Sequence, residues 1–234
     1  MKFEVAGGIF FDVGWTLLAP RYGNWTYNTA KMHEVMMSQR FLSIPEQRRR
    51  KVLEQAQAYL DSHVKVDSED EELYCMRMFF RMIFDGLPEL GLSAEDADEI
   101  ARDKVFNMEN YVYFEDAVPL LQKLRGRYRL GVISDTWPSI GRMLDYGGLT
   151  EFFDAFTFSC YVGACKPDRR IFEDALAKLG VPAQETIFID DIERNLDGAA
   201  ALGINPVLIT YKPGAIPSEK YPSIARVSDL LQLL

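Results

Sequence analysis

The arrangement of apolar and polar positions changes twice along the chain. The run Gly8-Ile9-Phe10-Phe11 is apolar throughout and predicts a buried strand over residues 3–13. From about residue 20 to residue 110 the sequence lacks β-branched runs and is rich in helix formers, so this segment is expected to be all-helical. Its helices are expected near residues 24–41, 45–60, 69–86 and 93–109.

From about residue 116 the pattern alternates between helices and short apolar strands. Strands are expected near residues 129–133, 155–158, 185–189 and 206–209, and helices near 116–125, 138–146, 169–179 and 193–202. Non-alternating apolar strands joined by helices are typical of a parallel sheet that is covered on both faces. The predicted class is therefore α/β, with a Rossmann-like parallel sheet as its core.

The N-terminal strand belongs with the later strands, which makes the predicted core discontinuous in sequence. Residues 1–17 and 111–234 are expected to form the α/β core, and residues 18–110 an inserted helical domain. The apolar content of 48% is ordinary for a globular protein.

Composition excludes several classes of partner. A formal charge of −9 argues against binding to nucleic acid or to an anionic membrane surface. No run approaches the ~18 apolar residues that a membrane span needs. Three irregularly spaced cysteines, Cys75, Cys160 and Cys165, do not form a disulfide framework and are expected to be reduced thiols. We therefore expect a cytoplasmic protein.

Acidic residues stand at the ends of two of the predicted strands. Asp12 follows the first apolar run, and Asp190 and Asp191 follow Thr186-Ile187-Phe188-Ile189. In an open parallel sheet, ligands bind beyond the carboxyl ends of the strands. Three carboxylates gathered there with a lysine nearby would bind a divalent cation and a phosphate.

The order of the motifs resembles that of the haloacid dehalogenase-like (HAD) hydrolase superfamily over essentially the whole chain. Asp12-Val13-Gly14-Trp15-Thr16 is similar to the opening motif Asp-x-Asp-x-Thr, with Gly14 in place of the second Asp. Ser134 ends a strand, Lys166 lies in Lys166-Pro167-Asp168, and Asp190-Asp191 open the last motif. Members with a helical cap inserted after the first motif have the same organisation.

The resemblance implies a set of roles. Asp12 would be the nucleophile that forms an aspartyl-phosphate, with Lys166 and Ser134 holding the phosphoryl group. The substrate would also be held by Thr16, Asp135 and, from the segment that leads into the cap, Arg21. Mg²⁺ would be bound by Asp12, the backbone carbonyl of Gly14, Asp190 and Asp191.

Gly14 bears on the reaction more than on the fold. A backbone carbonyl can still bind a metal ion, but the carboxyl that would protonate the leaving oxygen is missing. General acid–base help of this kind is typically worth ~10²–10⁴-fold in rate. Turn flexibility is an equally simple reason for a glycine at this position.

Three functions remain open from the sequence. The first is a Mg²⁺-dependent phosphohydrolase acting on a small phosphorylated metabolite, as a monomer or homodimer. The second is a haloacid dehalogenase, because that branch also lacks the second Asp and needs no metal. The third is a protein that keeps the fold and binds metal or phosphate without turnover. Taken singly, Ser134 is more simply a helix-capping residue and Lys166 a solvated surface residue.

Overall fold

The chain divides into two compact units in the computed structural model, which describes residue 3 and residues 7–234. The sheet unit comprises the described residues up to Ala19 together with residues 113–136 and 144–234. The helical unit comprises residues 20–112 and 137–143. The chain therefore passes between the units four times. Each unit is described separately below.

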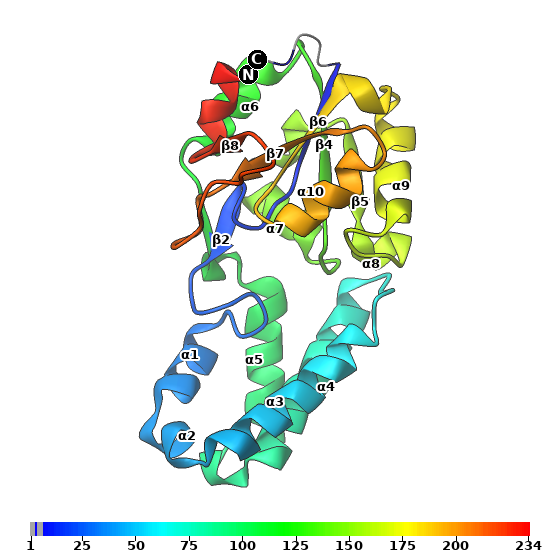
Figure 1. Cartoon of the computed structure of the whole chain (residues 1–234). Helices are drawn as coiled ribbons and strands as arrows, with labels where there is room; N and C mark the ends of the chain where they lie inside the picture. Colours follow the sequence, from blue (N-terminus) through cyan, green and yellow to red (C-terminus); the bar gives the residue numbers. More distant parts are fainter. Residues whose placement is uncertain (1–2, 4–6) are drawn as a thin grey trace. The chain divides into compact units, whose positions relative to one another are not determined.

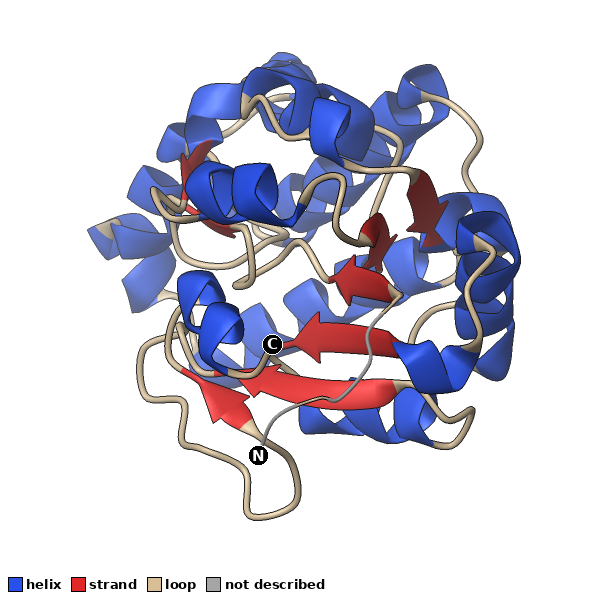
Figure 2. Ribbon diagram, turned by 90° about the horizontal axis from the view of Figure 1, so that it is seen from above, coloured by secondary structure: helices blue, strands red, loops and turns tan. Residues whose placement is uncertain are grey.

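The sheet unit is built on six parallel strands in the order β5-β4-β1-β6-β7-β8. Figure 2 draws the strands of the chain in red and the helices in blue. The strands are β1 (Gly8–Phe11), β4 (Arg129–Ser134), β5 (Ala155–Phe158), β6 (Thr186–Asp190), β7 (Asn205–Ile209) and β8 (Ser223–Ile224). The predicted α/β class with a parallel sheet is confirmed. The predicted strand over residues 3–13 is shorter in the structure, and its residues 4–6 lie outside the described residues.

Apolar side chains cover both faces of the central strands, which explains why these strands show no alternation in the sequence. Phe10 and Phe188 face the helices α9 (Arg169–Leu179) and α10 (Glu193–Ala200) and form one buried cluster with them. Their neighbours Phe11 and Ile189 are also fully buried, although successive side chains of a strand point to opposite faces. A strand buried on both faces reads as a continuous apolar run.

Glycine lets the layers of the sheet unit approach closely. A Cβ atom added to Gly131 of β4 would lie 2.7 Å from the ring of Phe10, and one added to Gly198 of α10 would lie 2.8 Å from the carbonyl oxygen of Pro167. Distances below 3.0 Å require neighbouring atoms to move. Helix α9 ends as predicted at Gly180, which adopts φ 70°.

Among its described residues the sheet unit contains two more α-helices, α6 (Ala117–Leu124) and α8 (Ser159–Val162), and receives the end of α7 (Ile140–Tyr146). A separate two-stranded sheet pairs β2 (Leu18–Pro20) with β3 (Tyr111–Tyr113), the two segments in which the chain leaves and re-enters the sheet unit. These short strands carry no apolar pattern long enough to be predicted.

The helical unit consists mainly of α1 (Ala30–Met37), α2 (Gln39–Ser43), α3 (Glu46–Asp61), α4 (Glu69–Gly86) and α5 (Ala94–Phe106) (Figure 1). Apolar side chains recur at helical spacing along α4, and those of Met76, Phe80 and Ile83 are buried in the core of this unit. Ser93 and Asp96 form a reciprocal capping box at the start of α5.

The single helix predicted over residues 24–41 is wrong. The side chain of Asn24 accepts hydrogen bonds from the backbone N–H groups of Thr26 and Tyr27, which holds these residues in a turn. Thr29 then caps α1, and Ser38 ends α1 and caps α2 by accepting from the N–H of Phe41. Side chains that bond to the local backbone compete with helix formation. In the part of the chain that the structure describes, no helix is both long and apolar enough to cross a bilayer.

Candidate active site

The ends of β1 and β6 bring two predicted site residues together. The strands pair in parallel register with Phe11 beside Ile189, and the N–H of Asp12 donates to the carbonyl of Ile189 at 2.9 Å. The register therefore places Asp12 beside Asp190 at the carboxyl edge of the sheet. Asp12 is 5% exposed and Asp190 is fully buried. This edge is the one at which parallel sheets bind ligands.

Lys166 joins these two carboxylates. Its Nζ atom lies 2.6 Å from Oδ1 of Asp12 and 2.7 Å from Oδ2 of Asp190, and it also donates to the carbonyl of Ile133 at 3.3 Å. The side chain of Lys166 is 3% exposed. A buried lysine so close to two carboxylates is not the solvated residue that a lone lysine usually is.

Burial and the neighbouring charges shift the pKa values of these groups. Burial works against the charge on Lys166, but Asp12 and Asp190 outweigh it and hold the pKa of the ammonium above its ordinary value. Burial raises the pKa of Asp12 to about 8, with Lys166 opposing the rise and Asp190 adding to it. Burial and Asp190 raise the pKa of Asp191 to about 6, opposed by Lys212 and Lys166. The three carboxylates thus carry more negative charge than one lysine neutralises.

Asn195 of α10 holds the side chain of Asp190, a role that the sequence analysis did not assign. Its side-chain Nδ2 donates to both carboxylate oxygens of Asp190 at 3.1 Å, while the backbone N–H of Ile192 donates to Oδ1 at 2.8 Å. Together with Lys166, these donors engage both oxygens of Asp190. The signal in the sequence was the placement of Asn195 one turn into the helix that follows the acidic pair.

The first motif makes a tight turn after β1. The backbone of Trp15 adopts φ 57°, in the left-handed region that non-glycine residues seldom occupy. The neighbouring Thr16 is fully buried, and among the described residues its hydroxyl has no hydrogen-bond partner. Such a buried, unpaired hydroxyl is costly and is a natural place for a ligand atom. Lys212 lies with its Nζ atom 6.0 Å from the centre of the Trp15 ring.

Ser134 ends β4, which neighbours β1, and Asp135 follows it. Ser134 is the last residue of this strand and is 4% exposed. Oδ1 of Asp135 accepts a hydrogen bond from the backbone N–H of Lys166 at 2.9 Å. Asp135 therefore fixes the loop that carries Lys166, a contact that the sequence did not reveal. The expected contact of Asp135 with substrate stays a prediction.

Arg21 belongs to the helical unit. Its Nε atom donates to the carbonyl oxygen of Glu109 at 2.6 Å, and its guanidinium donates to the carbonyl of Tyr111 at 3.4 Å. These bonds join the chain just beyond β2 to the chain around the start of β3. The role of Arg21 in holding an anionic substrate stays a prediction.

The donor set at the sheet edge suits a hard divalent cation. Asp12, Asp191 and the carbonyl of Gly14 are oxygen donors in a region of excess negative charge, as Mg²⁺ prefers. Within residue 3 and residues 7–234, no three side chains of Asp, Glu, His or Cys are already arranged to bind a metal ion together. Lys166 and Asn195 occupy the oxygens of Asp190, so a cation here would use the remaining donors and water.

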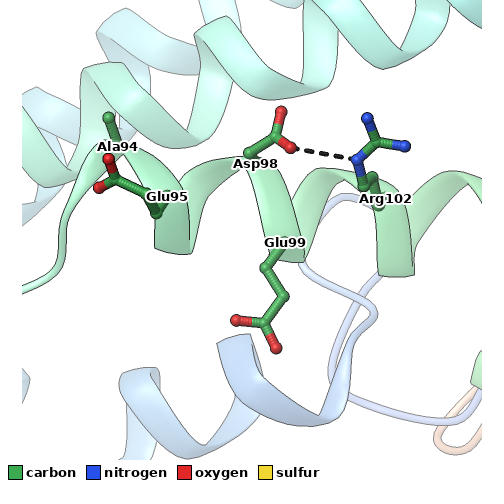
Figure 3. A pocket seen from close by; sticks show the side chains of 5 residues that line it. All are labelled: Ala94, Glu95, Asp98, Glu99 and Arg102. Carbon is green, nitrogen blue, oxygen red and sulfur yellow. Dashed lines mark hydrogen bonds and ion pairs between the residues drawn. The ribbon is translucent and has the colours of Figure 1, made fainter.

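A hollow on the surface of the helical unit has no chemistry comparable to that of the sheet edge. It lies on α5 and is lined by Ala94, Glu95, Asp98, Glu99 and Arg102 (Figure 3). Asp98 pairs with Arg102 at 3.1 Å and also with Arg77, and Glu99 pairs with Lys31 at 2.9 Å. Because these acids are already neutralised by surface partners, we assign no site to this hollow.

Comparison with known proteins agrees with the motifs. The haloacid dehalogenase-like hydrolase family matches residues 9–203, most of the chain. The protein therefore belongs to the haloacid dehalogenase-like hydrolase family, and the resemblance inferred from its motifs is confirmed. A curated relative, the pyrimidine 5'-nucleotidase YjjG of Escherichia coli, is 33% identical over 123 residues, covering 50% of this chain and 53% of the relative. The chain spans about half the length of the curated nucleotidases that it matches.

Solved structures share the fold over nearly the whole chain. A HAD phosphatase from Thermococcus onnurineus superimposes with a TM-score of 0.63 at 21% identity, covering 99% of this chain and 97% of that one. A 2-haloacid dehalogenase from Pseudomonas syringae superimposes with a TM-score of 0.66 at 18% identity, covering 97% of each chain. At these identities the likeness concerns the fold alone, and it includes both reaction classes.

Proposed function

We propose that the protein is a phosphohydrolase that acts on a small phosphorylated metabolite through an aspartyl-phosphate on Asp12. The observation that carries the proposal is the buried Asp12–Lys166–Asp190 arrangement at the carboxyl edge of the sheet. The match to a curated pyrimidine 5'-nucleotidase supports a phosphate ester as substrate. Thiol side chains at Cys75, Cys160 and Cys165 suit a reducing compartment such as the cytoplasm.

Each residue of the arrangement has a distinct task. Lys166 holds Oδ1 of Asp12 at 2.6 Å, which leaves the second carboxylate oxygen to attack phosphorus. As the leaving alkoxide departs, the ammonium lies close to the charge that develops on the phosphoryl oxygens. Asp190 and Asn195 keep Lys166 in place. Ser134 and Thr16 are hydroxyl donors for the phosphoryl group.

A metal ion would complete the charge balance of the site. We propose that Mg²⁺ is held by Asp12, the Gly14 carbonyl and Asp191. Asp190 holds Lys166 beside the ion. It would become a further ligand when Lys166 and Asn195 release its oxygens. The ion would supply Lewis-acid neutralisation of the phosphoryl oxygens. Burial, with the neighbouring charge of Asp190 adding to it, raises the pKa values of Asp12 and Asp191. Three acids beside one lysine support a cation at this place.

Gly14 limits the range of good substrates. A glycine cannot protonate the leaving oxygen, so esters with poor leaving groups should react slowly. Acyl and aryl phosphates depart without such help. We therefore propose that the chemical step is impaired for alkyl phosphates unless another acid or an ordered water takes part.

The test is hydrolysis of acetyl phosphate and p-nitrophenyl phosphate with Mg²⁺ by the protein and by Asp12→Asn. The asparagine has nearly the same shape as the aspartate but is a far weaker nucleophile. Turnover by the protein and none by the variant supports the proposal. Turnover that persists in Asp12→Asn would refute the aspartyl-phosphate mechanism. An inert protein that Gly14→Asp makes active would favour a binding protein that keeps the fold without turnover.

A haloacid dehalogenase is the second candidate, and one observation favours it. Both oxygens of Asp190 are taken by Lys166, Asn195 and Ile192, an arrangement that needs no metal ion. In that reaction the freed carboxylate oxygen of Asp12 would attack carbon and displace halide. Halide release from a 2-haloacid in the presence of EDTA would select this function over the first.

A further inference from the structure

The segment from residue 137 to residue 143 belongs to the helical unit, although sheet-unit residues precede and follow it. It begins one residue after Thr136 and two residues after Asp135, in the loop that follows Ser134. The side chain of Trp137 packs against the apolar cluster of the helical unit. The loop that carries Ser134 therefore continues, within three residues, into a segment that belongs to the helical unit.

A buried acid holds this segment. Glu72 of α4 is 2% exposed, and its Oε2 atom accepts from the backbone N–H of Ser139 at 2.7 Å while its Oε1 atom accepts from the hydroxyl of Ser139 at 2.7 Å. A buried carboxylate is costly unless such bonds satisfy it. Burial raises the pKa of Glu72, and the two bonds from Ser139 and the charge of Lys104 oppose the rise.

A second contact fixes the direction of the segment. Arg142 donates to both carboxylate oxygens of Glu69, at 3.2 and 2.8 Å. Glu69 and Glu72 lie one turn apart on α4, and Ser139 and Arg142 have the same spacing. These two contacts at matched spacing hold the segment in one register, antiparallel to the start of α4. The two acids also occupy the first turn of α4, where the helix dipole favours negative charge.

The other end of the loop is anchored within the sheet unit. The N–H of Thr136 donates to the hydroxyl of Ser159 at 2.8 Å, and that hydroxyl donates to the carbonyl of Thr136 at 3.2 Å. The conformation of residues 134–136 thus depends on β4 and Ser159 on one side and on the segment held by Glu72 on the other.

We infer that Glu72 is a positioning residue, which holds residues 137–143 on α4 and thereby ties the phosphate-binding loop at Ser134 to the helical unit. The inference rests on the proposed function, because Ser134 is placed there as a donor to the phosphoryl group. Through this connection the contact of Glu72 with Ser139 affects the conformation of the loop that carries Ser134. Two of the four chain passages between the units flank the segment, and β2 and β3 lie at the other two.

The kinetic test compares Glu72→Ala, Glu72→Gln and Ser139→Ala with the control Glu99→Gln. Glu99 is an exposed acid of the same unit whose ion-pair partner is Lys31. Loss of the contact lets the loop shift, and misplacement by about 1 Å can cost up to ~10²-fold in rate. We expect kcat/KM for p-nitrophenyl phosphate to fall ~10–100-fold in Glu72→Ala, mainly through KM, because a ground-state contact is weakened.

The remaining variants should lose less activity than Glu72→Ala. Inhibition by inorganic phosphate should weaken in parallel with KM. Glu72→Gln keeps an acceptor for Ser139 and should lose less than Glu72→Ala, and Ser139→Ala should lose least because its backbone N–H remains. Glu99→Gln should match the unmodified protein.

Amide hydrogen exchange separates positioning from a general loss of stability. In Ser139→Ala and Glu72→Gln the amides of Asp135 and Thr136 should exchange faster, by ~10-fold, while those of β6 keep their rates. Unchanged loop exchange together with an unchanged KM in folded variants would overturn the inference. If Glu72→Ala does not fold, the exchange rates and KM values of Ser139→Ala and Glu72→Gln decide whether the inference holds. If the unmodified protein hydrolyses no phosphate ester, the proposed function fails, and the exchange rates alone decide the role of Glu72.

Discussion

Replacing Lys166 by methionine tests whether the central ion pairs of the site have the energetic role that their burial indicates. Methionine has nearly the same volume as lysine and no charge, so the change removes one cation and leaves Asp12 and Asp190 facing each other. The side chains of these acids are 8% and 0% exposed. Removing one partner of a buried ion pair typically costs ~3–5 kcal/mol, because the remaining charge stays buried and uncompensated.

The pH dependence of this cost has a definite sign. A carboxyl whose pKa is raised in the folded state binds its proton more tightly there, so folding stability falls as pH rises above its unfolded pKa. Asp12 ionises in the folded protein at a pKa of about 8, and Lys166 keeps that value from being higher. In Lys166→Met the pKa of Asp12 rises further. The loss of stability should therefore be largest near pH 9 and smaller at pH 5, where Asp12 is protonated in both proteins.

Urea unfolding at pH 5 and pH 9 measures the loss of stability in Lys166→Met and its dependence on pH. At pH 9 we expect a loss of about 3–5 kcal/mol, which for a chain of this size lowers Tm by roughly 6–20 °C. Lys178→Met is the matched control, because Lys178 pairs with Asp174 at 2.7 Å but is 43% exposed, and such surface pairs contribute ~0–1 kcal/mol. An equal loss at both pH values, or a loss no larger than that of the control, would refute the reasoning.

Three further outcomes are expected. Gly14→Asp should raise kcat for alkyl phosphates by ~10²–10⁴-fold and change acetyl phosphate turnover little, and an equal gain on both substrates would contradict a role in leaving-group protonation. EDTA should abolish phosphatase turnover and added Mg²⁺ should restore it, so steady turnover of p-nitrophenyl phosphate in EDTA would exclude the proposed metal. Gly198→Ala should lower Tm by several degrees and kcat/KM together, because the new methyl group meets the carbonyl of Pro167 beside Lys166. An unchanged kcat/KM in that variant would show that the Lys166 loop adapts to the methyl group.

The strands and the motif order could be predicted from the sequence because both depend on local patterns. β4, β6 and α9 coincide closely with their expected ranges, since each is a continuous apolar run or an amphipathic helix bounded by clear end signals. The helix expected over residues 24–41 failed because Asn24 and Ser38 bond to the backbone nearby, and apolar periodicity does not report such bonds.

Contacts between distant residues could not be predicted in the same way. The bonds of Asn195 to Asp190 and of Lys166 to Asp12 depend on which strand ends become neighbours, and the sequence suggested this only through the resemblance to a family. The bond between Glu72 and Ser139 had no signal at all. An acid in the first turn of a helix is common, and its partner lies 67 residues further along the chain.

The central position of β1 in the sheet has a consequence for the synthesis of the protein. β1 is made first, but its neighbours β4 and β6 are about 120 and 180 residues further along the chain. At ~5–20 residues per second, the ribosome needs roughly ten to thirty-five seconds to deliver both neighbours. Until β4 emerges, Ile9, Phe10 and Phe11 have no neighbouring strand to pair with, and the segment of α1 to α5 is made before β4. A nascent chain of this protein therefore depends on protection of its first strand, and one that stops before Thr186 leaves that strand with an open edge.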